Sequence, residues 1–283
     1  MARPGCGGPA GGRIASAIVQ WWEAIVIVAA GTAAGAINAA VGSGTLITFP
    51  TLLALGYSPL VANVSNNIGL VPGGFAGAWG YRRELGGHRT TLKRLIPCSA
   101  LGGASGALLL LVLPPDAFAA IVPVLILLAL IMVVLQPWLS RMVASRQDAG
   151  ATAVRIASEW PTAWGFGAGL VFGTYAAGVY GGYFGAAQGV LLIGVLGLLL
   201  TDSLQTANGL KNVLSSVVNG IAAVTFVIVA PDRVNWVIVL LIALGSTAGG
   251  LVGAGIGRRL PAPVLRGVIV VVGLVAVVRL VFA

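Results

Sequence analysis

Long, nearly uninterrupted apolar runs follow one another along most of this sequence. A helix needs about 20 mostly apolar residues to cross the hydrocarbon core of a bilayer, and ten segments come close to that description, the second of them short. They cover residues 21–41, 43–57, 60–81, 95–113, 117–137, 162–180, 183–200, 204–230, 235–256 and 262–282. A transmembrane β-barrel would instead need stretches of about ten residues that alternate apolar and polar side chains. The continuous runs therefore predict an all-α integral membrane protein.

Charged residues are too scarce for a soluble protein of this length. They make up 8% of the 283 residues, against roughly 25% in an ordinary soluble domain. The net charge of +9 would suit a nucleic-acid partner if the basic residues were clustered in polar surface, but they lie between apolar runs. Disordered chains are polar, and Cys6 and Cys98 are too far apart in sequence to form a disulfide scaffold. The composition excludes all of these classes.

The two halves of the sequence resemble each other at several places, in the same order. The matching stretches are 31–44 with 169–182, 62–67 with 207–212, 99–106 with 246–253, and Leu113-Pro114 with Leu260-Pro261. Each half contains five of the apolar segments, and an odd number places two successive copies upside down relative to each other in a membrane. Inverted repeats with broken helices are common among secondary transporters.

We therefore predict a polytopic helical bundle of two inverted five-segment repeats with broken helices. The first membrane repeat covers 21–137 and the second 162–283, with a cytoplasmic linker at 138–161 and a disordered tail at 1–20. The tail also fits a cleaved signal peptide, because it places basic residues ahead of an apolar stretch. That stretch takes part in the repeat, however, so we favour the tail.

The distribution of basic residues supports the inversion, because cytoplasmic loops carry an excess of Lys and Arg. The stretch 82–94 carries five basic residues, whereas 113–117 carries none. The bias is reversed in the second half, where 230–234 has one Arg beside an Asp and 257–261 has Arg258 and Arg259. With the basic linker, this places 82–94 and 257–261 in the cytoplasm and both termini outside.

Glycine-rich stretches interrupt the apolar run near the start of each half, and we predict that they are breaks in helices. The first break contains Asn38, Gly42, Ser43, Gly44 and Thr45, and the second contains Tyr180, Gly181, Gly182 and Tyr183. Unwound backbone at membrane depth persists only where it lines a cavity or packs within protein. The free N–H groups where a helix restarts favour an anion. The alternative is close helix packing through small residues.

A polar run recurs at equivalent places in the two halves. It consists of Asn63, Asn66 and Asn67 in the first half and of Asn208, Lys211 and Asn212 in the second. Residues four apart share a helix face, and Lys211 lies about two turns into an apolar segment, where a polar group is costly and points to function. We predict that it contacts an anionic substrate together with these amides. The alternatives are snorkelling to the membrane surface and an ion pair with Asp202.

Asp202 is an acid close to the start of an apolar segment in the second half. Its carboxyl group is a candidate carrier of a coupling proton, but its position suits better a cap on the helix that begins at Ser203. The sequence shows no catalytic or metal-binding pattern, because its one histidine, His88, stands in a basic loop and no paired acids lie in the apolar segments. We expect no enzyme, no cofactor and no metal site.

The ordered motifs of both halves resemble those of the TauE/SafE family of sulfite and organosulfonate exporters. The resemblance covers about 21–282 and rests on residues 35–50, 55–59 and 62–66 in the first half, and on 165–182 and 206–212 in the second. The triple-glycine break that is usual in the family reads Gly42-Ser43-Gly44 here, and Gln188 stands where a second proline is expected. The resemblance implies a multi-pass transporter of the bacterial cytoplasmic (inner) membrane that carries small sulfur oxyanions or related organic acids.

Together these patterns predict a secondary transporter that moves a small anion, coupled to the proton gradient, with the substrate bound near the midplane against the broken helices and Lys211. The expected partners are the lipid bilayer and the anion, and a homodimer is left open. An anion channel on the same scaffold is the alternative function. A membrane-embedded enzyme or a structural subunit fits less well, because catalytic groups are lacking and polar residues lie within the membrane.

Overall fold

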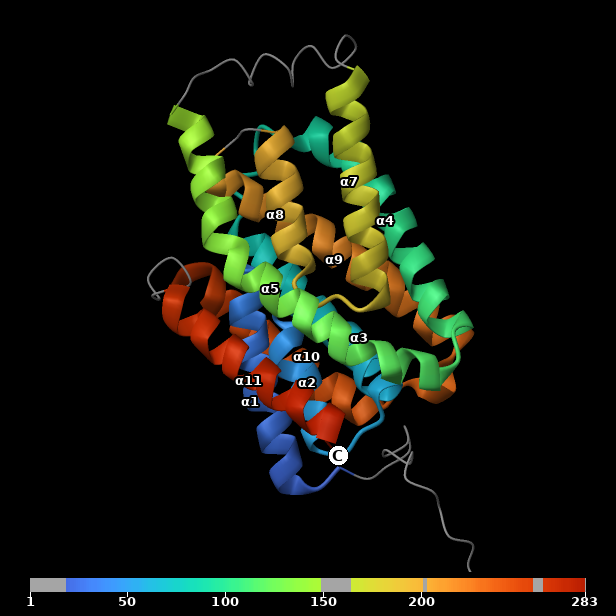
Figure 1. The fold of residues 1–283 in the computed structure, drawn as a ribbon. Coiled ribbons are helices and arrows are strands. Elements are labelled where there is room, and N and C mark those ends of the chain that lie inside the picture. Colours follow the sequence, from blue (N-terminus) through green and yellow to red (C-terminus); the bar gives the residue numbers. More distant parts are fainter. Residues whose placement is uncertain (1–18, 149–163, 201–202, 257–261, 283) are drawn as a thin grey trace, which may run out of the picture.

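The computed structural model describes residues 19–148, 164–200, 203–256 and 262–282, and helices are the only regular elements in these ranges. The helices, labelled as in Figure 1, are α1 (Trp21–Ala40), α2 (Thr45–Ala54), α3 (Pro59–Gly80), α4 (Arg89–Val112), α5 (Pro115–Asp148), α7 (Trp164–Tyr183), α8 (Gln188–Leu199), α9 (Leu204–Val229), the 3-10 turn η1 (Pro231–Arg233), α10 (Trp236–Ile256) and α11 (Ala262–Phe282). Each predicted apolar segment therefore corresponds to one α-helix, and the all-α prediction is confirmed for the described residues.

Several helices extend beyond the apolar segments that predicted them. α4 begins at Arg89, so part of the predicted basic loop 82–94 is helical. α5 continues through Asp148, which makes the first part of the predicted linker 138–161 helical as well. Helix ends are set by main-chain hydrogen bonds and not by hydropathy, because a helix satisfies its own main-chain groups in water as well as in lipid. The tail at 1–18 and the rest of the linker, 149–161, lie outside the described residues.

Among the described residues, five helices are long and apolar enough to cross a membrane. They are α1, α4, the Pro115–Met142 part of α5, α9 and the Trp236–Gly253 part of α10. Helices α2 and α8, at 10 and 12 residues, are shorter than the roughly 20 residues that a span requires. Each of these short helices directly follows a longer one, α1 or α7, after a turn of four residues, 41–44 or 184–187.

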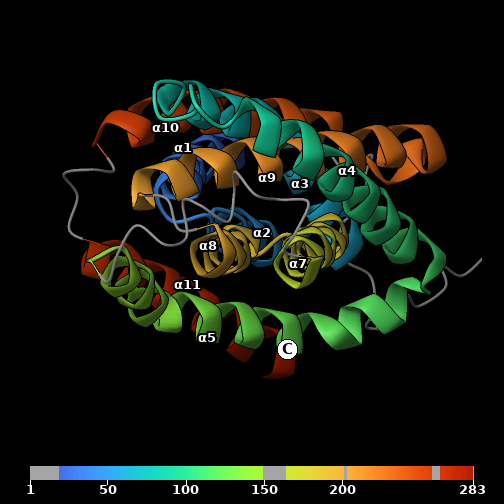
Figure 2. The ribbon, with the colours of Figure 1, turned by 90° about the horizontal axis from the view of Figure 1, so that it is seen from above.

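The helices of the two sequence halves pack across each other. α1 packs mainly against α10, and α7 packs mainly against α4. α3 also packs against α10, α9 packs against α4, and α3 and α9 contact each other. Figure 2 shows α5 and α11 along one side of the molecule, α9 and α10 toward the opposite side, and α2, α7 and α8 between them. The two short helices and their turns therefore lie in the interior of the bundle.

Glycines bring the crossed helices close together. A Cβ atom on Gly245 of α10 would lie 2.8 Å from Thr32 N of α1, and one on Gly102 of α4 would lie 2.9 Å from Gly178 Cα of α7. Such contacts are shorter than carbon side chains permit, so each of these positions requires glycine. Small residues at helix contacts are typical of membrane bundles, because they let the backbones approach and pack.

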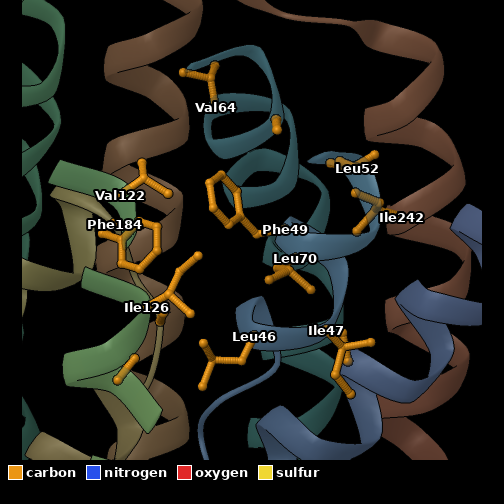
Figure 3. Packing of buried hydrophobic residues seen from close by; sticks show 14 of the residues in the cluster. Leu46, Ile47, Phe49, Leu52, Val64, Leu70, Val122, Ile126, Phe184 and Ile242 are labelled. Atoms are coloured by element: carbon orange, nitrogen blue, oxygen red, sulfur yellow. The ribbon is translucent and has the colours of Figure 1, made fainter. Parts of the chain in front are cut away.

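Aromatic side chains fill the core beside the two turns. Phe49 of α2 and Phe184 of the 184–187 turn meet edge to face, with ring centroids 5.3 Å apart and planes at 87°. Phe118 of α5 packs edge-on against both Phe184 and Tyr183. Figure 3 shows Phe49 and Phe184 facing each other among aliphatic side chains from several helices. Edge-to-face pairs of this kind favour one arrangement of the rings, and here they hold the second turn against α2 and α5.

Candidate functional site

The two turns inside the bundle have the same main-chain hydrogen bonds. In the first, the N–H groups of Val41 and Gly42 donate to Ile37 O at 2.7 and 3.1 Å. In the second, the N–H groups of Phe184 and Gly185 donate to Tyr180 O at 2.9 and 3.1 Å. Gly42 and Gly185 both adopt the left-handed conformation, with φ of +85° and +79°, which glycine enters without the penalty that a Cβ brings.

The second turn lies further along the chain than the glycine pattern predicts. Tyr180, Gly181, Gly182 and Tyr183 form the last turn of α7, and the chain leaves the helix only at Phe184. The predicted break at 180–183 is therefore wrong in position. Gly182 remains helical and faces Gly103 of α4, and Gly181 lies directly under the side chain of Gln188. For Gly181 and Gly182 the structure therefore favours close packing through small residues, the alternative that the sequence left open.

The two turns meet each other in the interior of the protein. Gly189 N, at the start of α8, donates to Gly42 O at 3.1 Å. A Cβ on Gly42 would lie only 2.5 Å from Gly189 Cα, so two glycines are needed for the backbones to pass. We call this contact between Gly42 and Gly189 the glycine crossing. It joins residues that are far apart in the sequence and places the start of α8 against the end of α1.

Lys211 of α9 is fully buried beside the glycine crossing. Its side chain has no exposed surface, and its Nζ donates to the main-chain oxygens of Asn38 and Ala39, at 3.0 and 3.2 Å. Its Cδ lies 3.2 Å from the position of a Cβ on Gly42. Snorkelling to the surface is thereby excluded. The amino group of Lys211 instead caps the C-terminal end of α1, where unpaired carbonyl groups carry partial negative charge.

Amide side chains complete the capping of both interrupted helices. Asn212 Nδ2 donates to Ala39 O of α1 at 3.1 Å. On the other side, Asn63 Nδ2 of α3 donates to Tyr183 O, the last residue of α7, at 3.0 Å. The polar run of each half therefore caps the first helix of the other half. Asn38, half-buried in the last turn of α1, takes part through its main chain.

A second buried polar group links α2 to α3. Asn66 Nδ2 donates to Thr45 Oγ1 at 3.4 Å, and Thr48 Oγ1 donates to Asn66 Oδ1. Thr48 is a site residue that the sequence analysis missed. It lies three residues after Thr45, a spacing that places both hydroxyls on one helix face, and that spacing could have revealed it.

Several polar groups of the predicted site residues and of Gln188 make no hydrogen bond within the part of the chain that the structure describes. The N–H groups of Ser43, Gly44 and Thr45 donate to no described main-chain group. Four buried side-chain atoms also make no hydrogen bond, and they belong to four polar residues: Ser43 (Oγ), Asn63 (Oδ1), Asn67 (Oδ1) and Gln188 (Nε2). Buried polar groups are nearly always hydrogen-bonded, so a water molecule or a ligand would supply the partners that these atoms lack.

Two further predicted site residues are Asn208 and Asp202. Asn208 is half-buried and its Oδ1 has no hydrogen-bond partner. Asp202 lies outside the described residues. The cap of α9 is Ser203, whose Oγ accepts a hydrogen bond from Thr206 N at 3.1 Å, so the capping role that we favoured for Asp202 is filled by its neighbour.

A helical bundle with five described helices long and apolar enough to cross a membrane, in which buried amides and a lysine cap α1 and α7, is typical of a multi-pass α-helical membrane protein. The chain belongs to the sulfite exporter TauE/SafE family, whose model matches residues 27–280. Membership in this family makes it a membrane transporter.

Curated relatives agree with this assignment. The chain is 24% identical over 249 residues to proteins named "Probable membrane transporter protein YfcA" from three Escherichia coli strains, K12, O6:H1 and O157:H7. The matched region covers 88% of this chain and 86% of each relative. No solved structure matches.

Proposed function

We propose that this protein is a secondary transporter that moves a small anion across the cytoplasmic membrane, coupled to the proton gradient. The anion is sulfite, an organosulfonate or a related organic acid. One observation carries the proposal: an ammonium group has three N–H donors, and only two of those on Lys211 are used, by Asn38 O and Ala39 O. The third is available to an anion beside the glycine crossing.

The unpartnered N–H groups of Ser43, Gly44 and Thr45 extend this site. They lie at the N-terminal end of α2, whose first residue is Thr45, and such a helix end attracts negative charge. The oxygens of a sulfonate or a sulfite can accept several such bonds at once. Orphaned donors and a cation from different helices together suit an oxyanion better than a neutral solute.

Alternating access in a transporter of this kind needs two bodies that can rearrange around the site. Two observations support the two inverted repeats on which that mechanism is usually built. The two turns have the same main-chain hydrogen bonds, and the first helix of each half packs mainly against a helix of the other half, α1 against α10 and α7 against α4. In our proposal the glycine crossing is the contact that the rearrangement opens and closes.

The test is flux through the purified protein in liposomes. Uptake is measured for sulfite, sulfoacetate, taurine, methanesulfonate and simple carboxylates, with and without an imposed proton gradient. We expect saturable uptake of at least one anion that follows the gradient. Flux that rises linearly with concentration and ignores the proton gradient would instead identify the alternative, an anion channel.

Lys211→Ala is expected to abolish this uptake while leaving membrane insertion intact. The matched control is Lys93→Ala, which removes the other lysine of the chain, an exposed residue on α4. It should transport like the unmodified protein. Full transport by correctly inserted Lys211→Ala protein would refute the site.

A further inference from the structure

The number of hydrogen bonds that Lys211 makes within the protein distinguishes the two protonation states of its side chain. A neutral amine has two N–H donors and an ammonium has three. The structure supplies two acceptors, Asn38 O and Ala39 O, at 3.0 and 3.2 Å. Both N–H donors of the neutral amine are therefore paired without substrate, whereas the ammonium keeps one N–H that only an added acceptor can satisfy.

We propose that Lys211 carries the coupling proton as well as the anion, so that each anion is moved together with one proton on the same side chain. This inference rests on the proposed function and assigns its coupling residue. It removes the need for a buried carboxylate to serve as the proton carrier.

The immediate surroundings of Lys211 support this assignment. Asn38, Ala39, Gly42 and Gly189 contact it, and none of them has an ionisable side chain. No described carboxylate pairs with Nζ, so no fixed negative charge holds the ammonium in place when the site is empty. A buried charge that loses its partner is strongly unfavourable, so the anion and the proton stabilise each other in the site.

The helices packed around α9 bring few ionisable side chains to this region. Among their described residues, α3 and α8 have none. Glu23 lies in the first turn of α1, about 20 Å of helix from Asn38. The remaining ionisable side chains of the described elements in contact with α9 are Arg89, Lys93, Arg94 and Cys98 on α4, Asp116 and Arg141 on the part of α5 up to Met142, Asp232 and Arg233 on η1, and the tyrosines Tyr175, Tyr180 and Tyr183 on α7. Tyr81, which follows α3, lies against Gly209 of α9. Lys211 is thus the one basic side chain in contact with the glycine crossing within the part of the chain that the structure describes.

The transport cycle follows from this donor count. When the site faces the side of higher proton concentration, the amine of Lys211 takes up a proton and the resulting third N–H donates to an anion. The loaded site, in which one negative charge of the anion balances the ammonium, then changes access. The anion leaves, the proton is released to the same side, and the amine with both its N–H groups paired returns empty. One proton and one anion have crossed, and no bond other than N–H is made or broken.

The first experiment measures proton uptake by the unmodified protein. Methanesulfonate is added to purified protein in weakly buffered detergent solution near neutral pH, with a pH-indicator dye, and anion binding is measured in parallel. Because methanesulfonate itself takes up no proton there, any proton that disappears is bound by the protein. We expect one proton for each bound anion. Binding of the anion without proton uptake would overturn the inference.

The second experiment replaces Lys211 by arginine, which keeps its charge because the guanidinium is not deprotonated in proteins. In liposomes, Lys211→Arg should still exchange labelled methanesulfonate for unlabelled methanesulfonate, since exchange needs only the loaded site. Net uptake driven by a proton gradient should fall to the level of liposomes without protein. Lys211→Gln should lose both activities. Proton-driven net uptake by Lys211→Arg would refute the assignment.

The outcomes separate this inference from the proposed function. If the unmodified protein neither binds nor transports any anion of the panel, both are refuted. If it transports an anion and binds it without a proton, the transporter remains and the coupling residue lies elsewhere. Asp202→Asn then tests the other candidate, because uncoupling by that variant alone would assign the proton to Asp202. The proton-uptake measurement needs no variant, so anion binding without proton uptake refutes the inference even if arginine does not fit beside Gly42.

Discussion

Replacing Gly42 by alanine tests whether the glycine crossing holds the two interrupted helices together. The change has two separate costs. Alanine in the left-handed conformation at φ +85° is expected to cost about 1–2 kcal/mol. Its Cβ would lie 2.5 Å from Gly189 Cα, a backbone atom that cannot rotate away, and overpacking of this kind typically costs about 1–3 kcal/mol. The sum is a destabilisation of about 2–5 kcal/mol.

Two other glycines separate these costs. Gly56 has the same conformation, with φ +86°, but a Cβ there would meet nothing within 4 Å. Gly56→Ala should therefore show the conformational cost alone, about 1–2 kcal/mol. Gly194 lies inside α8 and is also open, so Gly194→Ala should be neutral or stabilising by up to about 1 kcal/mol. From the most to the least stable, the expected order is Gly194→Ala, the unmodified protein, Gly56→Ala and Gly42→Ala.

The assay is thermal unfolding of each purified variant in the same detergent, with transport measured in liposomes. A change of 1 kcal/mol shifts Tm by roughly 2–4 °C for proteins somewhat smaller than this one, so Gly42→Ala should melt on the order of 5–15 °C lower. It should also lose transport, because the turn must move away from α8 to admit a Cβ. If Gly42→Ala and Gly56→Ala have the same Tm, the close contact between Gly42 and Gly189 is wrong.

Three further substitutions test single contacts, each by thermal unfolding in detergent. Ser203→Ala removes the cap of α9 and should cost about 1 kcal/mol, whereas an unchanged Tm would mean that another residue caps the helix. Thr48→Val keeps the shape but leaves buried Asn66 Oδ1 without its donor, which should cost about 1–3 kcal/mol. Asn63→Ala removes the cap on α7 and should cost about 1–3 kcal/mol, more than Asn208→Ala, which removes no hydrogen bond found in the structure.

Hydropathy alone predicts the number and order of the helices but places several of their ends wrongly. The apolar segment from 95 to 113 corresponds to a helix that starts at Arg89, and the segment from 117 to 137 to one that runs to Asp148. Hydropathy reports where the chain tolerates lipid. The helix itself continues for as long as its main-chain bonds are satisfied, and neither arginine nor aspartate prevents that in water.

The position of the second turn could not be predicted from its residues. Gly181 and Gly182 look like a break but stay helical, because their missing side chains make room for Gln188 and for α4. The chain leaves the helix at Phe184 and passes through a left-handed Ala187, with φ +59°. Alanine is not a residue that indicates this conformation, so tertiary packing, including the Phe184 rings, imposes the turn.

The sequence identified Lys211 as exceptional but could not identify its partners. Those partners are main-chain oxygens of Asn38 and Ala39, and every residue has such an oxygen, so no side-chain pattern reveals which ones are near. From the sequence alone, only side chains can be considered as partners of Lys211, and the acidic side chain offered for an ion pair was Asp202. The two oxygens that bind its amino group are determined by the fold, which places the end of α1 beside Lys211 of α9.

Capping and packing link the two halves of the sequence so closely that neither half is a separate packing unit. α1 depends on α10 for its glycine-mediated contact and on Lys211 and Asn212 for its cap, and α7 depends in the same way on α4 and on Asn63. The polar residues of the site therefore hold the fold together and also keep donors free for a ligand. Every substitution of Lys211 removes part of a cap along with a charge, so loss of transport in a variant has two explanations. Proton uptake by the unmodified protein avoids this ambiguity because the cap stays intact there, and the comparison of Lys211→Arg with Asp202→Asn then assigns the proton to one residue.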